Sequence, residues 1–150
     1  MPSDGSNREG DGGKTKLAEL KTFHDKAASG SAKNGVIKLT CMKESADAYR
    51  AMLEYRSATA PAAVHETDVE LMIVLEGTGN IVTGGKVVDE KRVNDHNLSG
   101  PSIADGKSQA VAKGDMIIVP SHTPHQVIPT GGAPIILMTL HAPAAPANWP

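Results

Sequence analysis

Three side chains of the kinds that bind metals or transfer protons stand at two separate places in the sequence. His65 and Glu70 lie in "AVHETDVELMIVLEG", and His125 lies far downstream in "GDMIIVPSHTPH". Two imidazoles and one carboxylate hold non-haem iron(II), and the same ligands bind zinc, manganese or nickel. A carboxylate buried at the start of an apolar run needs a metal, a cation or a proton. The pattern predicts a metal centre, although Arg50 or Arg56 would satisfy Glu70 equally well.

Neighbouring strands are needed to bring these three residues together. His65 is expected at the end of one strand, and Glu70 near the start of the next, on the same face as Met72 and Val74 because side chains alternate along a strand. His125 is expected to start another strand after a proline-rich bend. Many short apolar runs punctuated by Gly and Pro predict an all-β sandwich or barrel.

The chain divides into three regions. Residues 1–34 read as a polar leader with a short amphipathic helix, residues 35–142 as the barrel, and residues 143–150 as a Pro- and Ala-rich tail. The glycine turn that begins at Gly77 is predicted to close a hairpin between the two runs that flank it. The polar stretch 88–110 is longer than a usual hairpin loop, so we interpret it as a lid or a loosely ordered insertion.

Composition excludes several classes of partner. With 150 residues, 39% of them apolar, the chain is long enough for one domain with an aliphatic core. The net charge of −2 and the scattered Lys and Arg residues argue against nucleic-acid or membrane binding. Cys41 is the only cysteine, so neither an internal disulfide nor a cysteine zinc cluster is expected. No signal-peptide core is visible, so the protein is cytoplasmic by default, or exported with its signal absent from this sequence.

Both segments resemble the paired motifs of the cupin superfamily. His65, Glu70 and Gly77 match the second half of the first motif. Four residues separate His65 from Glu70, and six separate Glu70 from Gly77. Gly114, Pro120 and His125 match most of the second motif. Five residues separate Gly114 from Pro120, and four separate Pro120 from His125. The resemblance implies a cupin-type double-stranded β-helix, that is, a jelly-roll barrel.

The sequence also departs from the family pattern. Ala63 stands where the family has its first metal histidine, so one of the four usual protein ligands is missing. His122 replaces a glycine in the bend before His125, a place that often needs an unusual backbone angle. Pro129 replaces the closing asparagine. These changes bear on metal affinity rather than on the fold.

Two further histidines have more than one interpretation, and two further acidic residues have one. His122 is a candidate replacement ligand or general acid–base, or else a plain surface residue, and Glu70 is the other catalytic candidate. His141 could reach the barrel mouth, but we expect it at a frayed, exposed strand end. Glu66 and Asp68 read as solvated turn residues.

Two functions are compatible with these residues. The first is a metal-dependent enzyme that acts on a small organic molecule as a dioxygenase, isomerase or lyase, with a divalent metal (Zn, Fe, Mn or Ni) held by His65, Glu70 and His125. The second is a non-catalytic cupin that binds a small molecule and has a structural metal or none. The strand "LMIVLEG" is apolar on both faces, and the resemblance implies that such strands pair subunits, so a homodimer is expected.

Overall fold

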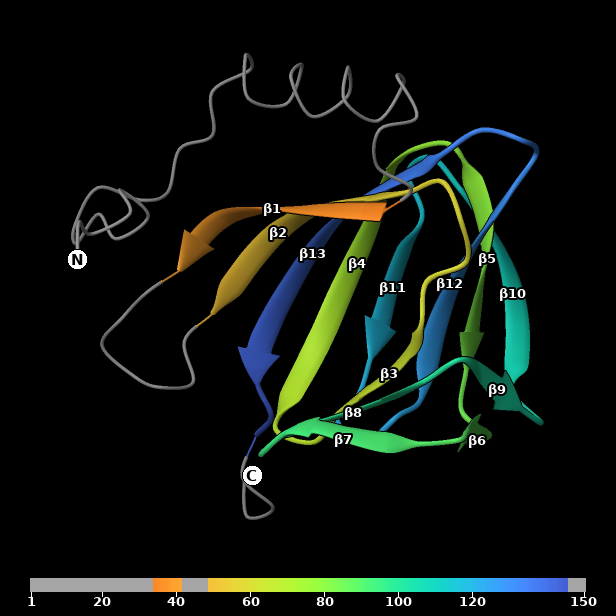
Figure 1. The fold of residues 1–150 in the computed structure, drawn as a ribbon. Coiled ribbons are helices and arrows are strands. Elements are labelled where there is room, and N and C mark those ends of the chain that lie inside the picture. The colour runs from red at the N-terminus through yellow and green to blue at the C-terminus, as the bar shows by residue number, and fades with distance from the viewer. Residues whose placement is uncertain (1–33, 42–48, 146–150) are drawn as a thin grey trace.

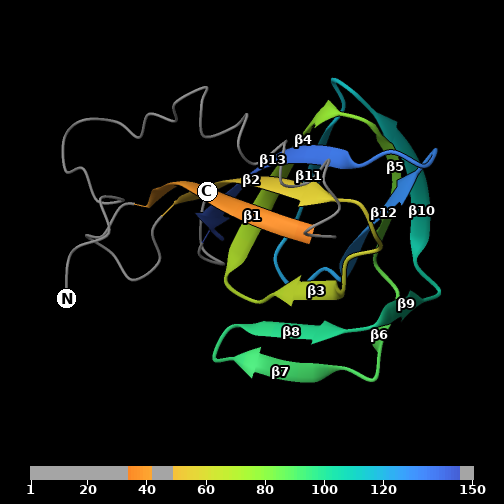
Figure 2. The same cartoon turned by 45° about the horizontal axis from the view of Figure 1, so that its top comes forward.

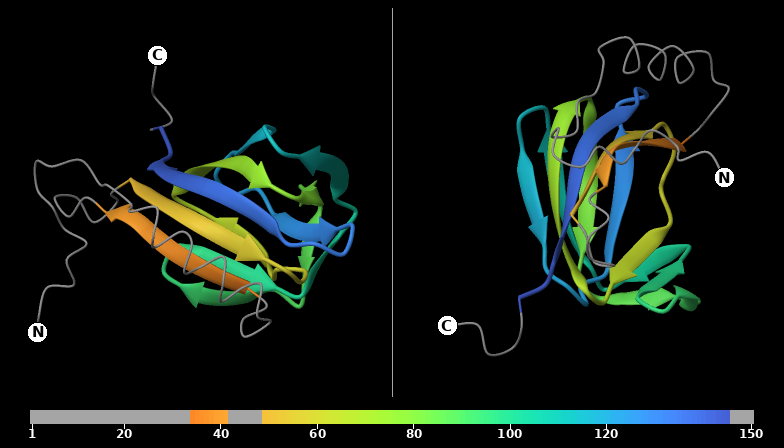
Figure 3. Two further views of the ribbon diagram at one scale, coloured as in Figure 1. Left: turned by 90° about the horizontal axis from the view of Figure 1, so that it is seen from above. Right: turned by 90° about the vertical axis from the view of Figure 1, so that its left-hand side faces the viewer.

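The computed structural model describes residues 34–41 and 49–145, and all of its regular elements are antiparallel strands. Most of them form two large sheets that face each other as layers (Figures 1 and 3). The prediction of an all-β jelly roll is therefore confirmed. The predicted N-terminal helix and most of the C-terminal tail lie outside the described residues. Among the described residues, no helix has the length and apolar character needed to cross a membrane.

The first sheet has five strands in the spatial order β1-β2-β13-β4-β11. In chain order they are β1 (Asn34–Cys41), β2 (Arg50–Arg56), β4 (Asp68–Glu76), β11 (Met116–Val119) and β13 (Ile135–Pro143). The second sheet has six strands in the order β10-β5-β12-β3-β8-β7. They are β3 (Ala62–His65), β5 (Thr78–Thr83), β7 (Lys91–Asn94), β8 (Asn97–Gly100), β10 (Lys107–Ala112) and β12 (His125–Thr130). A separate two-stranded sheet pairs β6 (Lys86–Val88) with β9 (Ser102–Ala104).

The core lies between the two large sheets and is aliphatic, as the composition predicts. Along β4, Glu70, Met72 and Val74 are buried while the residues between them are less so, which is the expected alternation of a strand. The β5 and β12 strands supply Ile81 and Val127 from the opposite sheet. Burial of each such side chain contributes about 1.5–3 kcal/mol.

The outward face of the first sheet is more exposed than the inward one. On β11, Met116 is 70% exposed and Ile118 is 67% exposed. They lie opposite Ile73 and Leu71 of β4. On β4, Leu71 and Ile73 are part-buried, whereas Met116 and Ile118 beside them are exposed.

The predicted hairpin at Gly77 is wrong. The strands on its two sides, β4 and β5, lie in different sheets, so the turn carries the chain from one layer to the other. Gly77 has φ +82°, and a Cβ there would lie 2.2 Å from the carbonyl oxygen of Pro134. The turn therefore needs glycine for its backbone angle and because another backbone segment passes close to it.

The stretch 88–110 is not a loosely ordered insertion. It folds into β7, β8 and β9 and the first part of β10. Figure 2 shows β7 and β8 extending the second sheet beyond β3. In this pairing Asn97 of β8 lies opposite His65 of β3, so the polar segment becomes part of the wall beside a candidate metal ligand.

Candidate metal centre

A cavity of about 340 Å³ opens between the two sheets. Its lining includes apolar side chains from both layers, among them Met52, Met72 and Val127. It also includes His65, Glu70, His125 and His141, which gather in one region of it. This size and mixture of surfaces are typical of small-molecule sites.

Glu70 is the centre of this group. It is only 3% exposed. Its Oε2 atom lies 2.9 Å from His125 Nε2 and 3.5 Å from His65 Nε2, and its Oε1 atom lies 3.4 Å from His141 Nε2. Although these atoms are close, Oε2 has no partner in hydrogen-bond geometry among the described residues. The carboxylate therefore faces three imidazole nitrogens at once.

His65 reaches Glu70 from the end of β3. Its other ring nitrogen, Nδ1, lies 2.6 Å from Oδ1 of Asn97. The Asn97 amide donates to Asn94 Oδ1 at 2.8 Å, which leaves Asn97 Oδ1 free to accept from the imidazole. The proton of His65 is therefore assigned to Nδ1, and the lone pair of Nε2 points toward Glu70.

His125 is oriented in the same way by the backbone. It starts β12, after the bend that contains Pro120 and Pro124, and its Nδ1 donates to the carbonyl oxygen of Thr123 at 3.1 Å. His122 in this bend has φ +59°, as the loss of the family glycine led us to expect, and its backbone N–H donates to His65 O at 2.8 Å. The bend thus positions His125 and ties β12 to the end of β3.

His141 corrects one prediction. We expected it at a frayed, exposed strand end, but it is 4% exposed and lies directly opposite Glu70 in the pairing of β13 with β4. Strand β13 has neighbours on both sides, so its end does not fray. His141 Nδ1 lies 3.6 Å from Asp68 Oδ2, an ion-pair distance rather than a hydrogen bond. Asp68 also pairs with Arg50, so it is not the solvated turn residue that we predicted.

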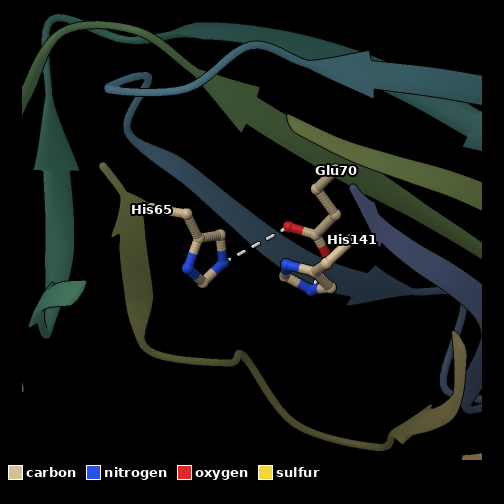
Figure 4. Close-up of side chains that lie close together, drawn as sticks. All are labelled: His65, Glu70 and His141. Carbon is tan, nitrogen blue, oxygen red and sulfur yellow. Dashed lines mark ion pairs between the residues drawn. The ribbon is translucent and has the colours of Figure 1, made fainter. Parts of the chain in front are cut away.

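In all three histidines Nε2 faces Glu70, and in His65 and His125 Nδ1 is hydrogen-bonded to an acceptor, whereas the buried Nδ1 of His141 has no hydrogen-bond partner among the described residues. Figure 4 shows His65 and His141 approaching the carboxylate from different strands. The rings of His65 and His141 are 4.7 Å apart between centroids, and those of His65 and His125 are 5.0 Å apart. Metal-binding histidines are commonly held in this way, with the second nitrogen bonded to a carboxylate, amide or backbone oxygen.

Burial and charge act in opposite directions on these groups. Burial, the largest single effect, raises the pKa of Glu70, but contacts with His125, His141 and His65 outweigh it and hold that pKa well below its usual range. For His65, burial lowers the pKa, yet the contacts with Glu70 and Asn97 and the nearby carboxylate charges raise it overall. The cluster therefore favours an ionised carboxylate with positive charge close to it.

The donor set fits a divalent metal. The ligand atoms of His65, Glu70 and His141 all lie within 4.8 Å of one another. The predicted ligand His125 is not in this mutually close group, although its Nε2 atom lies 2.9 Å from Glu70 Oε2. Neutral imidazole and carboxylate are suitable ligands for zinc, iron, manganese and nickel.

Other sequence candidates lie elsewhere. His122 is exposed and does not line the cavity. The arginines that could have satisfied Glu70 are engaged with other carboxylates, Arg50 with Asp68 and Arg56 with Glu54. Glu66 pairs with Arg92 on the surface. The arginine salt bridge that a purely structural barrel would use for Glu70 is thus not formed among the described residues.

Sequence reasoning missed His141 as a member of the cluster, and missed Asn97 and Asp68 as its supports. The alternation in "APIILMTLHA" places His141 on the inward face with Ile135 and Leu137, and this signal could have found it. Asn97 and Asp68 depend on strand pairing between distant segments, which no local pattern contains.

No family model and no curated protein matches this chain. Solved structures do match. BH2720 from Bacillus halodurans is 19% identical, with 91% of this chain and 86% of that chain covered and a TM-score of 0.57. The Cnp3 cupin domain of Schizosaccharomyces pombe is 14% identical, with 75% and 66% covered and a TM-score of 0.55. The Fe(II) form of HppE is 15% identical, with 74% and 52% covered and a TM-score of 0.56.

Proposed function

Because this chain has the cupin fold, we propose that it is a single-domain metal-dependent enzyme acting on a small organic molecule. One observation carries this proposal: three histidines direct Nε2 at the same buried carboxylate beside a cavity, and two of them, His65 and His125, have Nδ1 hydrogen-bonded to an acceptor. A fold is shared by proteins of many functions, so the argument depends on this site rather than on the similar structures.

We assign four ligands to the metal: His65, Glu70, His125 and His141. The family pattern places a histidine at position 63, where this chain has alanine. Ala63 lies on β3 opposite His125. His141 supplies the missing imidazole from β13, in the other sheet. The metal would therefore still have four protein ligands, as the family pattern implies, although position 63 does not supply one of them.

When bound, the metal would act as a Lewis acid that polarises an oxygen of the substrate. Asn97 and the carbonyl of Thr123 hold the ring nitrogens that face away from it. Met52 and Met72 line the cavity and exclude water from part of its wall. Dioxygenase, isomerase and lyase reactions all suit such a centre. Its metal could be Zn, Fe, Mn or Ni, and HppE is recorded in Fe(II) and Co(II) forms.

Metal content is the first test. The wild-type protein, purified untagged after growth with each metal, should carry near-stoichiometric metal by mass spectrometry. His125→Ala should lose it, whereas His96→Ala, which changes an exposed histidine outside the cavity, should keep it. If the wild-type protein contains no metal under any of these growth conditions, the proposal of a metal-dependent enzyme is contradicted.

A non-catalytic metal barrel is the second candidate, because four protein ligands suffice to close a tetrahedral structural site. Water-proton relaxation of Mn²⁺-loaded protein separates the two. An enzyme should enhance relaxation through exchangeable water on the metal, while a closed site should give little enhancement.

We further propose that the protein is a homodimer that pairs through the outward face of β11 and β4. β11 is an edge strand of its sheet and exposes Met116 and Ile118. An exposed apolar edge favours association with a second copy. Light scattering should report a dimer, and Met116→Lys with Ile118→Lys should give a monomer. Val93→Lys, at a residue 64% exposed on β7, is the matched control. A monomeric wild type would contradict the proposal.

A further inference from the structure

The outward face of the first sheet is buried unevenly, and its most buried part lies on β2. Met52, Glu54 and Arg56 line the cavity, so the residues between them, Leu53 and Tyr55, lie on the outward face. Leu53 is 5% exposed and Tyr55 is 2% exposed, yet neither belongs to the core cluster between the sheets. The free face of an antiparallel sheet is commonly solvated, so this part of the face must have a cover.

The covered region continues onto β13 and ends before β11. Tyr55 lies opposite Ile136 of β13, which is also buried. Leu53 lies opposite Met138, and the same row of the sheet runs through β4 to Met116 of β11. Burial decreases along this row, from Leu53 through the part-buried Met138 to the exposed Met116. The cover therefore lies over β2 and β13 and leaves β11 open.

The described strands do not supply this cover. They belong to the two facing sheets or to the small β6–β9 sheet, which contacts β8 and β12 of the second sheet. Among the described strands, none is therefore stacked on the outward face of β2 and β13. The side chains are nevertheless buried within a single chain, so a second copy does not account for their burial.

Of the segments outside the described residues, residues 1–33 are best placed to reach this region. Strand pairing places Asn34, where β1 begins, opposite Arg56, so residues 1–33 join the sheet at the covered end of β2. Residues 42–48 and 146–150 adjoin the other end of β2 and β13. The first segment therefore starts beside the buried outward side chains, whereas the other two start away from them.

Residues 15–29 have the pattern of a helix that needs an apolar partner. In "TKLAELKTFHDKAAS", Leu17, Leu20 and Phe23 recur at helical spacing, whereas Thr22 falls on the opposite face. A helix of this length would be about 22 Å long, enough to extend from β1 across β2 and β13, because neighbouring strands are about 5 Å apart. An amphipathic helix is stabilised mainly by the packing of its apolar face.

We propose that residues 15–29 pack, through Leu17, Leu20 and Phe23, on the outward face of β2 and β13 of the same chain. The exposed β11 edge stays open for the second copy proposed above. Since the inward residues of β2 line the cavity, the packed segment supports that cavity wall from behind. No proposed metal ligand lies on the outward face, so this inference is independent of metal content.

Phe23 is the only phenylalanine of the chain, so NMR can detect its contacts directly. The full chain is deuterated except for the Phe ring and the methyl groups of Ile, Leu and Met. We expect nuclear Overhauser effects from the Phe23 ring to methyl groups of Leu53, Ile136 or Met138. A second sample mixes chains protonated only on the ring with chains protonated only on the methyl groups, and it should give no such signal. Signals in the mixed sample, or no contact with β2 and β13 in the first, would overturn the inference.

Substitutions in the segment test the same contact. Leu20→Asp should abolish the Phe23 signals, lower the urea midpoint, and speed amide hydrogen exchange in β2 about tenfold or more, because the strand loses its cover. Leu20→Ala, a milder change, should have the same effects to a smaller extent in a chain that still folds. Thr22→Asp, which adds the same charge on the opposite helix face, is the matched control and should change none of them. Equal effects at positions 20 and 22, or none at position 20, would contradict the packing.

Discussion

His141 lies directly opposite Glu70 in the pairing of β13 with β4, and its Nε2 atom is 3.4 Å from Glu70 Oε1. Arg50 of β2 lies opposite the same histidine on the other side of β13. The three residues therefore form one row across three neighbouring strands. Since Asp68 contacts both His141 and Arg50, the row is also connected at its outer side. This row places the His141 imidazole beside Glu70, at a position that the family motif does not include.

Removal of His141 should disrupt metal binding, and restoration of the family histidine should repair it. We expect His141→Ala to lower metal affinity by about tenfold to a hundredfold or more, since even the outer partners of ligands have effects of this size. Adding Ala63→His should recover much of the loss, because position 63 lies opposite His125 and lines the cavity. Chelator competition measures both. Undiminished affinity in His141→Ala would show that His141 is not a ligand.

Asn97 should matter for metal binding although it touches no metal ligand except His65. Asn97→Ala removes the acceptor that holds His65 Nδ1 at 2.6 Å, so the ring loses its fixed orientation and affinity should fall about tenfold to a hundredfold. Asn97→Asp retains an acceptor and should stay near the wild-type affinity. Ser99→Ala, two residues along β8, is the control for general damage to the strand. Equal affinities for Asn97→Ala and wild type would contradict the role of Asn97.

Metal affinity should rise with pH and then level off. The pKa of His65 is raised above its ordinary value of 6.5, and a proton on the ring must leave before the metal binds. Affinity should therefore fall as pH drops below that raised pKa, and stay constant above it. The hydrogen bond to Asn97 is one cause of the raised pKa, so Asn97→Ala should shift the levelling-off to lower pH. Chelator competition across a pH series measures the curve, and a flat curve around neutral pH would contradict the expectation.

Gly77 should be intolerant of any side chain. In Gly77→Ala the new Cβ would lie 2.2 Å from Pro134 O at a φ of +82°, so the free energy of unfolding should fall by about 3 kcal/mol or more. Gly84 has φ +73° but nothing within 4 Å of its Cβ position, so Gly84→Ala should cost only about 1 kcal/mol. Urea unfolding measures both, and similar losses would show that the contact with Pro134 is unimportant.

The fold class could be predicted because its signals are local. Alternation in β4 put Glu70, Met72 and Val74 on one inward face, and the structure has all three buried. The hairpin at Gly77 could not be judged in the same way. A glycine turn between two apolar runs looks alike whether the strands pair or enter different sheets, and the difference depends on partners far along the chain.

The sequence by itself determined the types and spacing of His65, Glu70 and His125, and hence that two imidazoles and a carboxylate would occupy strand ends on inward faces. Only the tertiary structure decided which distant residues join them. His141 reaches Glu70 through the pairing of β13 with β4, and Asn97 reaches His65 through the pairing of β8 with β3. The physical reason is that strand register arises from long-range backbone hydrogen bonds and core packing, and a shift of one residue would turn His141 away from the cavity.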